Sequence, residues 1–308
     1  MMRVMLLFVV LLAWVPPHAI AWTFTKTFEE FTVGQTGGDS NFSPSTGGSV
    51  TNTYAHGGTK SFQVSMLFAN GESVGVHIMN FPSNVTEGQE LWWRIYVFAP
   101  TGFNWTTGSL AKLMRLTNKA PGGADDQYLS ILWERPQQNE CNTATYGSPP
   151  NVYGYLVVEG GEWYQDVIAP QGYPTTSLSY CQNRNTSNNG SKFLVTNAWQ
   201  SVEMYVKVSS SGTGAYRMWY DGVLFWEQAN ISTIDSGGYL GNGNTVTHLL
   251  GAWNGGVPVD QIIYFDDIVM TTDTPSGRDI LGNPMIGLTQ YKNARASGGT
   301  ALSGGARF

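Results

Sequence analysis

Two tyrosines separated by one residue are the clearest candidates for acid–base chemistry. Tyr153 and Tyr155 stand in Val152-Tyr153-Gly154-Tyr155-Leu156, inside a run that we expect to be a strand. Side chains two positions apart in a strand lie on one face of the sheet, so both phenols should face the same way. A nearby cation lowers the pKa of a phenol, which would make either tyrosine a plausible base or acid.

A lysine and an arginine in a neighbouring run are candidate cations for such a site. Lys112 and Arg115 both lie in Ser109–Thr117, which we expect to be a strand. Their separation of three residues is out of phase with a two-residue period, so a regular strand would place them on opposite faces. The alternative is that Lys112 is an ordinary solvated strand residue and that the tyrosines serve in packing or in stacking on sugars.

Other catalytic arrangements have little support in the sequence. Glu159 and Glu162 flank Gly160-Gly161, a turn, so they do not form the rigid pair of carboxylates that a glycoside hydrolase needs. Phosphate-loop and His-Glu-x-x-His motifs are absent.

Composition and charge indicate a folded, exported and acidic protein. Charged residues make up only 12% and aromatic residues 13% of the chain, so it can bury enough apolar surface to exclude intrinsic disorder. Residues 1–21 combine Arg3, a short apolar run and Ala19-Ile20-Ala21, which predicts a cleaved signal peptide and a secreted protein. The net charge of −6, with no basic run, argues against nucleic acid and membrane partners. We expect a monomer, and a local basic cleft could still bind an acidic sugar.

Strands must position these residues, because no stretch shows a sustained helical period. Runs rich in β-branched and aromatic residues recur between clusters of Gly, Asn, Pro and Ser, which predicts an all-β, antiparallel sandwich or jelly roll. In the run Trp199–Ser209, Val202, Met204 and Val206 alternate with polar residues, as in a half-buried strand. Asp221-Gly222 predicts a tight hairpin. The expected strands are Trp22–Phe31, Ser61–Phe68, Ser73–Asn80, Glu90–Ala99, Ser109–Thr117, Gln127–Glu134, Asn151–Glu159, Trp199–Ser209, Ala215–Tyr220, Val223–Gln228, Thr245–Ala252 and Gln261–Thr271.

One domain and one disulfide follow from the same sequence. We expect a single β-jelly-roll domain over residues 22–273 and a C-terminal extension over 274–308, whose Gly- and Ser-rich end is expected to be disordered. In an exported chain, Cys141 and Cys181 most simply form a disulfide that closes a loop of about 40 residues.

Several segments, in order, resemble a known family. The most specific is the Pro100–Trp105 turn followed by the strand that carries Lys112, and the others are Leu91–Val97, Tyr128–Arg135 with Trp133, Tyr216–Gly222 and Tyr264–Ile268. Together they resemble the concanavalin A-like jelly roll of polysaccharide lyases, in particular glucuronan lyases and the related short alginate lyases, over roughly residues 85–270. The resemblance implies β-elimination on an acidic polysaccharide.

The resemblance also implies roles for individual residues. Lys112 would neutralise the uronate carboxylate or take the C5 proton, and Tyr153 or Tyr155 would complete the proton transfer. Arg135 and His77 are further catalytic candidates, although His77 alternates with apolar residues and can instead be a hydrogen-bonded sheet histidine. The family carries an arginine three residues before its tryptophan, and here that position is Ser130. The expected substrate-binding residues are Trp105, Arg115, Gln127, Ser130 and Trp133.

The chemistry implied by the resemblance needs no cofactor, but sandwiches of this type often hold a structural calcium ion. Glu29, Asp39 and Asp267, with Glu30 and Asp266, offer the oxygen ligands that Ca²⁺ prefers. They can equally be ordinary surface or capping carboxylates. The main alternative to a lyase is a carbohydrate-binding sandwich without catalysis, in which loop aromatics stack on sugars. A structural surface protein is a third possibility, supported by the glycine-rich tail alone.

Overall fold

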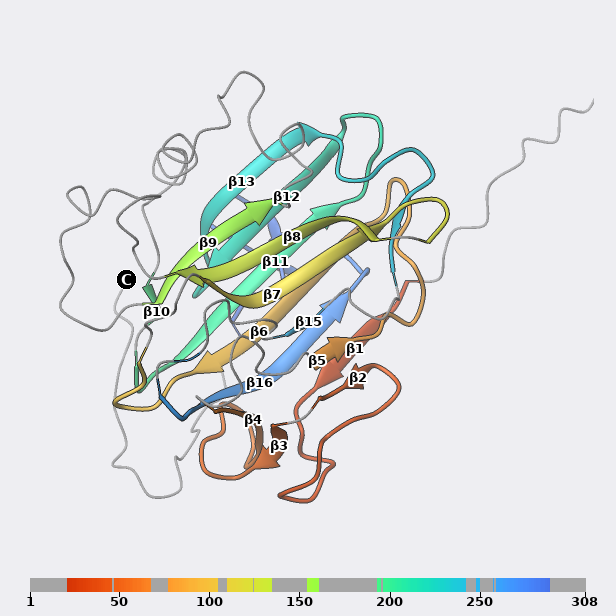
Figure 1. The fold of residues 1–308 in the computed structure, drawn as a ribbon. Coiled ribbons are helices and arrows are strands. Elements are labelled where there is room, and N and C mark those ends of the chain that lie inside the picture. The colour runs from red at the N-terminus through yellow and green to blue at the C-terminus, as the bar shows by residue number, and fades with distance from the viewer. Residues whose placement is uncertain are drawn as a thin grey trace, which may run out of the picture.

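The computed structural model describes residues 21–45, 47–67, 77–104, 110–123, 125–134, 154–160, 193–194, 196–241, 248–249, 257 and 259–288. Over these residues the chain forms strands and loops, and two antiparallel sheets pack face to face (Figure 1). No helix in the described part of the chain is long and apolar enough to cross a membrane. The predicted antiparallel β-sandwich is therefore confirmed.

Sheet A has the strand order β13-β12-β11-β6-β16-β4-β3, with β1 also pairing with β16. The bounds are β1 Thr23–Lys26, β3 Gly48–Thr51, β4 Ser61–Met66, β6 Glu90–Phe98, β11 Trp199–Lys207, β12 Gly214–Tyr220, β13 Val223–Ile231 and β16 Gln261–Thr271.

Sheet B has the strand order β10-β9-β8-β7-β15-β5-β2, with β14 also pairing with β7. The bounds are β2 Phe42–Ser43, β5 His77–Met79, β7 Leu110–Lys119, β8 Asp125–Glu134, β9 Gly154–Gly160, β10 Phe193–Leu194, β14 Tyr239–Leu240 and β15 His248–Leu249. A small hairpin follows sheet A in the chain and consists of β17 Gly277–Arg278 and β18 Pro284–Met285.

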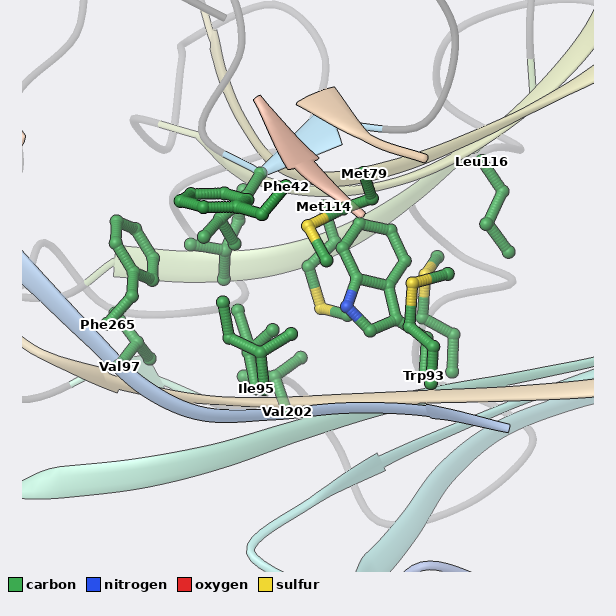
Figure 2. Close-up of a cluster of buried hydrophobic side chains, with 14 of the residues drawn as sticks. Phe42, Met79, Trp93, Ile95, Val97, Met114, Leu116, Val202 and Phe265 are labelled. Atoms are coloured by element: carbon green, nitrogen blue, oxygen red, sulfur yellow. The ribbon is translucent and has the colours of Figure 1, made fainter. Parts of the chain in front are cut away.

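The main core lies between the two sheets. On β6, alternate residues Trp93, Ile95 and Val97 are buried on the inner face, because side chains along a strand point to opposite faces in turn (Figure 2). Met114 and Leu116 of β7 are buried in the same cluster from the facing sheet (Figure 2). Each of these side chains stabilises the fold by roughly 1.5–3 kcal/mol relative to an exposed position.

The hairpin predicted at Asp221-Gly222 is confirmed. Tyr220 of β12 pairs with Val223 of β13, so two residues make the turn. Both have positive φ, 46° at Asp221 and 75° at Gly222, which is the backbone that a type I′ hairpin requires.

The outer face of sheet A is covered by the segment after residue 273. Trp92 Nε1 donates to Pro284 O at 3.0 Å, and Trp219 Nε1 donates to Asp279 Oδ2 at 2.9 Å. Met285 packs with both tryptophans in a second apolar cluster. β11 is consequently buried on both faces, not half-buried as its alternation predicts. The first part of the expected C-terminal extension, residues 277–288, therefore packs on sheet A.

Candidate active site

Four of the candidate positions, Lys112, Arg115, Ser130 and Tyr155, lie on the outer face of sheet B, the face that points away from the main core. Leu113, Met114 and Leu116 of β7 are buried in that core, which identifies the inner face of the sheet. Positions directly opposite each other in an antiparallel pair lie on the same face, so the strand register assigns the remaining positions.

A β-bulge in β7 places Lys112 and Arg115 on the same outer face. Lys112 pairs with Leu132 of β8, but Met114 pairs with Ile131, so Leu113 is an extra residue on β7. Leu113 and Met114 are adjacent in sequence, yet both are fully buried. Arg115 pairs with Ser130, which lies two positions from Leu132. The expectation that Lys112 and Arg115 face opposite sides is therefore wrong, because it assumed a regular strand.

Tyr155 belongs to this outer face as well. Tyr155 of β9 pairs with Glu134 of β8, and Val157 pairs with Leu132. Lys112 and Tyr155 are thus two strands apart across the sheet and one same-face step apart along it. Strand spacing and rise put their Cα atoms about 12 Å apart.

His248 continues the row that contains Ser130 and Arg115. Residue 248 of β15 pairs with Arg115, while Leu249 pairs with Met114 and is fully buried. His248 therefore occupies an outer-face position beside Arg115. The sequence alone does not decide which face of the sheet residue 248 occupies.

Two predicted binding residues do not gain support from the register. Trp133 pairs with Ala111 on β7 and with Leu156 on β9, which are inner-face positions. The register therefore gives no support to a role of Trp133 beside Lys112 and Tyr155, and its role in substrate binding stays a prediction. Gln127 stands between the pairs Thr117–Tyr128 and Lys119–Asp125, where the register shifts.

His77 is a core residue, which corrects its prediction as a catalytic group. Its side chain is fully buried, and its ring lies edge-on to Phe62 at a centroid distance of 5.0 Å. The backbone N–H of Ser45 donates to His77 Nδ1 at 3.2 Å. Burial lowers the pKa of His77 to about 4, so the ring is neutral at physiological pH. The register puts it on the inner face of β5, on the opposite side of the sheet from Lys112.

The remaining predicted residues lie outside the described residues. These are Tyr153, Arg135, Trp105 and the cysteine pair Cys141 and Cys181, together with residues 1–20 of the expected signal peptide. Their predicted roles remain predictions.

The carboxylates expected to bind calcium do not fit a metal site. Lys26 is 1% exposed, and its ammonium contacts both Asp39 and Glu30, the latter at 2.7 Å, so a lysine already provides the cation there. Glu29 Oε1 accepts from the backbone N–H groups of Thr59 and Lys60. Among the residues that the structure describes, no three His, Cys, Asp or Glu side chains gather as metal ligands.

The carboxylate of Asp267 also has a partner within the protein. Its Oδ2 lies 2.6 Å from His56 Nδ1, and the ring of His56 stacks on Tyr96 at 3.5 Å. The neighbouring Asp266 accepts hydrogen bonds from the backbone N–H groups of His56, Gly57 and Asp267. Burial, and then the charge of Asp267, raise the pKa of Asp266 to about 8. This buried cluster fixes the loop around His56 to β16.

Comparison with known proteins agrees with this architecture. The family model described as polysaccharide lyase matches residues 40–269. The structure of alginate lyase Aly36B has a TM-score of 0.54 and 14% identity, covering 82% of this chain and 97% of that chain. A variant of that lyase, in which a lysine and a tyrosine are replaced by alanine, was solved with an alginate tetrasaccharide and has a TM-score of 0.51 at 14% identity, covering 82% and 97%.

A fungal enzyme is also similar. The endo-β-1,4-glucuronan lyase of Trichoderma reesei has a TM-score of 0.48 and 12% identity, covering 81% of this chain and 95% of that chain. No curated protein sequence matches the chain. The likeness to the alginate lyase confirms the predicted jelly roll.

Proposed function

Since the chain belongs to the polysaccharide lyase family, we propose that it cleaves a uronate-containing polysaccharide by β-elimination on the outer face of sheet B. The observation that carries this proposal is the shared face of Lys112 and Tyr155, which follows from the register of β7, β8 and β9. Alginate and glucuronan are the first substrates to test, because similar structures are named for them.

The reaction needs two kinds of help from the protein. A base removes the proton at C5 of a uronate, the C4–O4 bond breaks as the C4–C5 double bond forms, and O4 leaves with a proton. Charge moves onto the uronate carboxylate during this step, so a fixed cation such as Lys112 lowers the barrier. Tyr155 can take or return the proton, because a phenol near a cation ionises more readily.

We propose that the protein is secreted. Residues 1–21 have the pattern of a signal peptide, and an extracellular location would suit a protein that meets polymeric uronates. We also propose that Cys141 and Cys181 form a disulfide, as an oxidising compartment would allow. Mass spectrometry of the secreted protein, with and without reduction, tests both statements.

The test of catalysis is the absorbance of the unsaturated uronate end at ultraviolet wavelengths. Alginate, glucuronan, pectate and hyaluronan are each incubated with the mature protein, and absorbance is expected to rise with at least one. Tyr155→Phe should lower kcat by about 10²–10⁴-fold, and Lys112→Ala by about 10²–10³-fold, since they remove a proton carrier and a charge stabiliser.

Tyr239→Phe is the matched control, because Tyr239 lies on β14 at the far end of β7, opposite Lys119. It should keep the wild-type rate. A wild-type protein that releases no unsaturated product from any of the four polymers would contradict the proposal.

A carbohydrate-binding protein without catalysis is the second candidate. The observation that favours it is Ser130 on the outer face, where the family resemblance expects an arginine. Retardation of the protein in a gel containing one polymer, without any rise in absorbance, would support this alternative.

A further inference from the structure

We propose that the outer face of sheet A carries a second carbohydrate site, which binds an uncharged, extended chain of β-linked hexoses and takes no part in catalysis. Sheet A forms the opposite layer of the sandwich from the sheet of the proposed active site. The proposal does not rest on the lyase reaction, because its evidence is a row of side chains on sheet A alone.

The register of sheet A aligns one side chain from each of five adjacent strands. Val97 of β6 and Phe265 of β16 are buried in the main core, so the positions next to them in each strand face outward. Four strand spacings give the row a length of about 19 Å, enough for several sugar rings. The row consists of Trp199, Phe98, Tyr264, Gln63 and Ser49, on β11, β6, β16, β4 and β3.

Part of this row is open to solvent. Residues 277–288 cover one end of the outer face of sheet A. The loop that holds His56 covers Tyr96 in the adjacent row. Trp199 and Gln63 nevertheless remain partly exposed, so a ligand can reach the row.

Two partly exposed aromatic side chains stand on the row. The ring of Tyr54, from the loop after β3, lies 4.4 Å from the ring of Phe98 and 5.0 Å from that of Tyr264 between centroids. Trp199 also contacts Phe98, at 5.3 Å. Tyr54 and Trp199 can therefore stack on the apolar C–H faces of β-linked hexoses, in which the hydroxyls point sideways from the ring.

The same aromatic side chains offer unused polar groups. Among the residues that the structure describes, the indole N–H of Trp199 and the hydroxyls of Tyr54 and Tyr264 have no hydrogen-bond partner. Sugar hydroxyls can provide one, since an aromatic residue with a polar tip suits a ligand that is both apolar and hydroxylated. The amide of Gln63 donates to Ser49 Oγ at 3.2 Å, and no described residue donates to its carbonyl oxygen.

The charge of this face favours a neutral ligand over an acidic one. The row itself contains no acidic or basic side chain. Asp266 stands in the adjacent row, opposite Tyr96, and Asp267 follows it in β16. A chain of uronates would meet these carboxyl groups with no cation in the row to compensate them, whereas an uncharged chain would not be repelled.

Calorimetric titration with cellohexaose tests the proposal apart from catalysis. Cellohexaose has no carboxylate, so β-elimination cannot consume it, and the wild-type protein should bind it. Trp199→Ala should weaken binding about 5–10-fold and Gln63→Ala about 3–5-fold, since they remove a stacking side chain and a hydrogen-bonding group. Trp199→Phe keeps an aromatic ring and should lose less than about 3-fold.

Tyr239→Ala is the matched control, because Tyr239 is a partly exposed aromatic residue on β14 of sheet B. It should keep the wild-type affinity for cellohexaose. Gln63→Ala assigns the site even if Trp199→Ala lowers the melting temperature, because the amide of Gln63 bonds only to Ser49 among the described residues.

The hexasaccharide of glucuronan tests the charge argument, because it has a carboxylate where cellohexaose has a hydroxymethyl group. It is titrated into the Tyr155→Phe protein, which should not consume it, with and without Trp199→Ala. Its affinity should be the same in the two proteins.

Two results would overturn the proposal: no binding of cellohexaose at millimolar concentration, or an affinity that neither Trp199→Ala nor Gln63→Ala lowers. Weaker binding of the glucuronan hexasaccharide after Trp199→Ala would overturn the preference for neutral chains. Failure of the proposed lyase function would leave the cellohexaose results unchanged, since it is seen only as the absence of unsaturated product.

Discussion

Glu203 shows how one buried carboxyl can hold a distant segment. It is 1% exposed in β11 and accepts hydrogen bonds from the backbone N–H groups of Ile286 at 2.6 Å and Gly287 at 3.2 Å. Arg94 completes the contact by donating to Gly287 O. Burial raises the pKa of Glu203 to about 7, against the opposing effect of these hydrogen bonds and of the Arg94 charge.

The stability of the protein should fall as pH rises from about 4.5 to about 7. The folded pKa of Glu203 lies above its ordinary value of 4.5, so in this interval the folded state holds a proton that the unfolded state has lost. Asp266, with a pKa raised to about 8, adds to the same trend. His77, whose pKa is lowered from 6.5 to about 4, acts in the opposite direction below about pH 6.5, but two raised carboxyls outweigh one lowered histidine. Urea unfolding of the wild type at pH 5 and pH 8 should give a lower free energy of unfolding at pH 8.

Glu203→Gln should show a smaller difference between the two pH values, because the proton that folded Glu203 retains no longer contributes. Asp235→Asn, a change at an exposed position, serves as the control and should keep the wild-type difference. A wild-type free energy of unfolding that rises between pH 5 and pH 8 would contradict the interpretation of Glu203.

At the scale of elements, the bulge in β7 decides which residues can act together. A regular strand would bury only one of Leu113 and Met114, whereas both are fully buried. The bulge thereby keeps two apolar side chains in the core. From Met114 to Thr117, β7 then pairs with β8 without a further shift in register.

Alanine substitutions measure the bulge directly. Leu113→Ala and Met114→Ala should each lower the free energy of unfolding by about 2–5 kcal/mol, since each leaves a cavity in the core. In a regular strand one of the two changes would fall on the outer face and cost less than about 0.5 kcal/mol. Equilibrium urea unfolding of both variants therefore distinguishes the two arrangements.

Much of the fold could be predicted from the sequence, and the failures have a common cause. β16 matches its prediction at both ends, and β6 and β11 match to within two residues, because all three are long runs rich in β-branched and aromatic residues. The Asp221-Gly222 turn depends only on local backbone preferences and was equally predictable.

What could not be predicted depends on partners far away in the chain. The face of Arg115 follows from its pairing with Ser130 and His248, which a period of two along one strand cannot reveal. The burial of His77 depends on Phe42 and Phe62, and the second buried face of β11 depends on residues 277–288. Local patterns predict which segments are strands, whereas tertiary pairing decides the site.

At the scale of the whole molecule, the segment after residue 273 is part of the domain. Its removal would expose Trp92 and Trp219, which are 1% and 0% exposed in the complete fold, and would remove Met285 from their cluster.

Two truncations test this assignment. A chain ending at Asp273 should lose at least about 3 kcal/mol of stability, which corresponds to a melting temperature lower by about 6–12 °C for a domain of this size. A chain ending at Leu288 should melt within about 2 °C of the full chain. Equal melting of both truncations would show that residues 277–288 contribute little to the fold.

The order of strands in sheet A has a consequence for biosynthesis. β16 lies between β6 and β4 and also pairs with β1, whose residue Thr23 meets Thr271. Before Gln261 has been synthesised, the other strands of sheet A therefore form two separate groups. The edges of β6 and β4 that will pair with β16 have no partner at that stage. Such long-range closure makes folding slow, and the open edges can pair with another chain in the meantime. The ribosome thus delivers β16, an interior strand of sheet A, last among the eight strands of that sheet, so sheet A cannot close until residues 261–271 have been made.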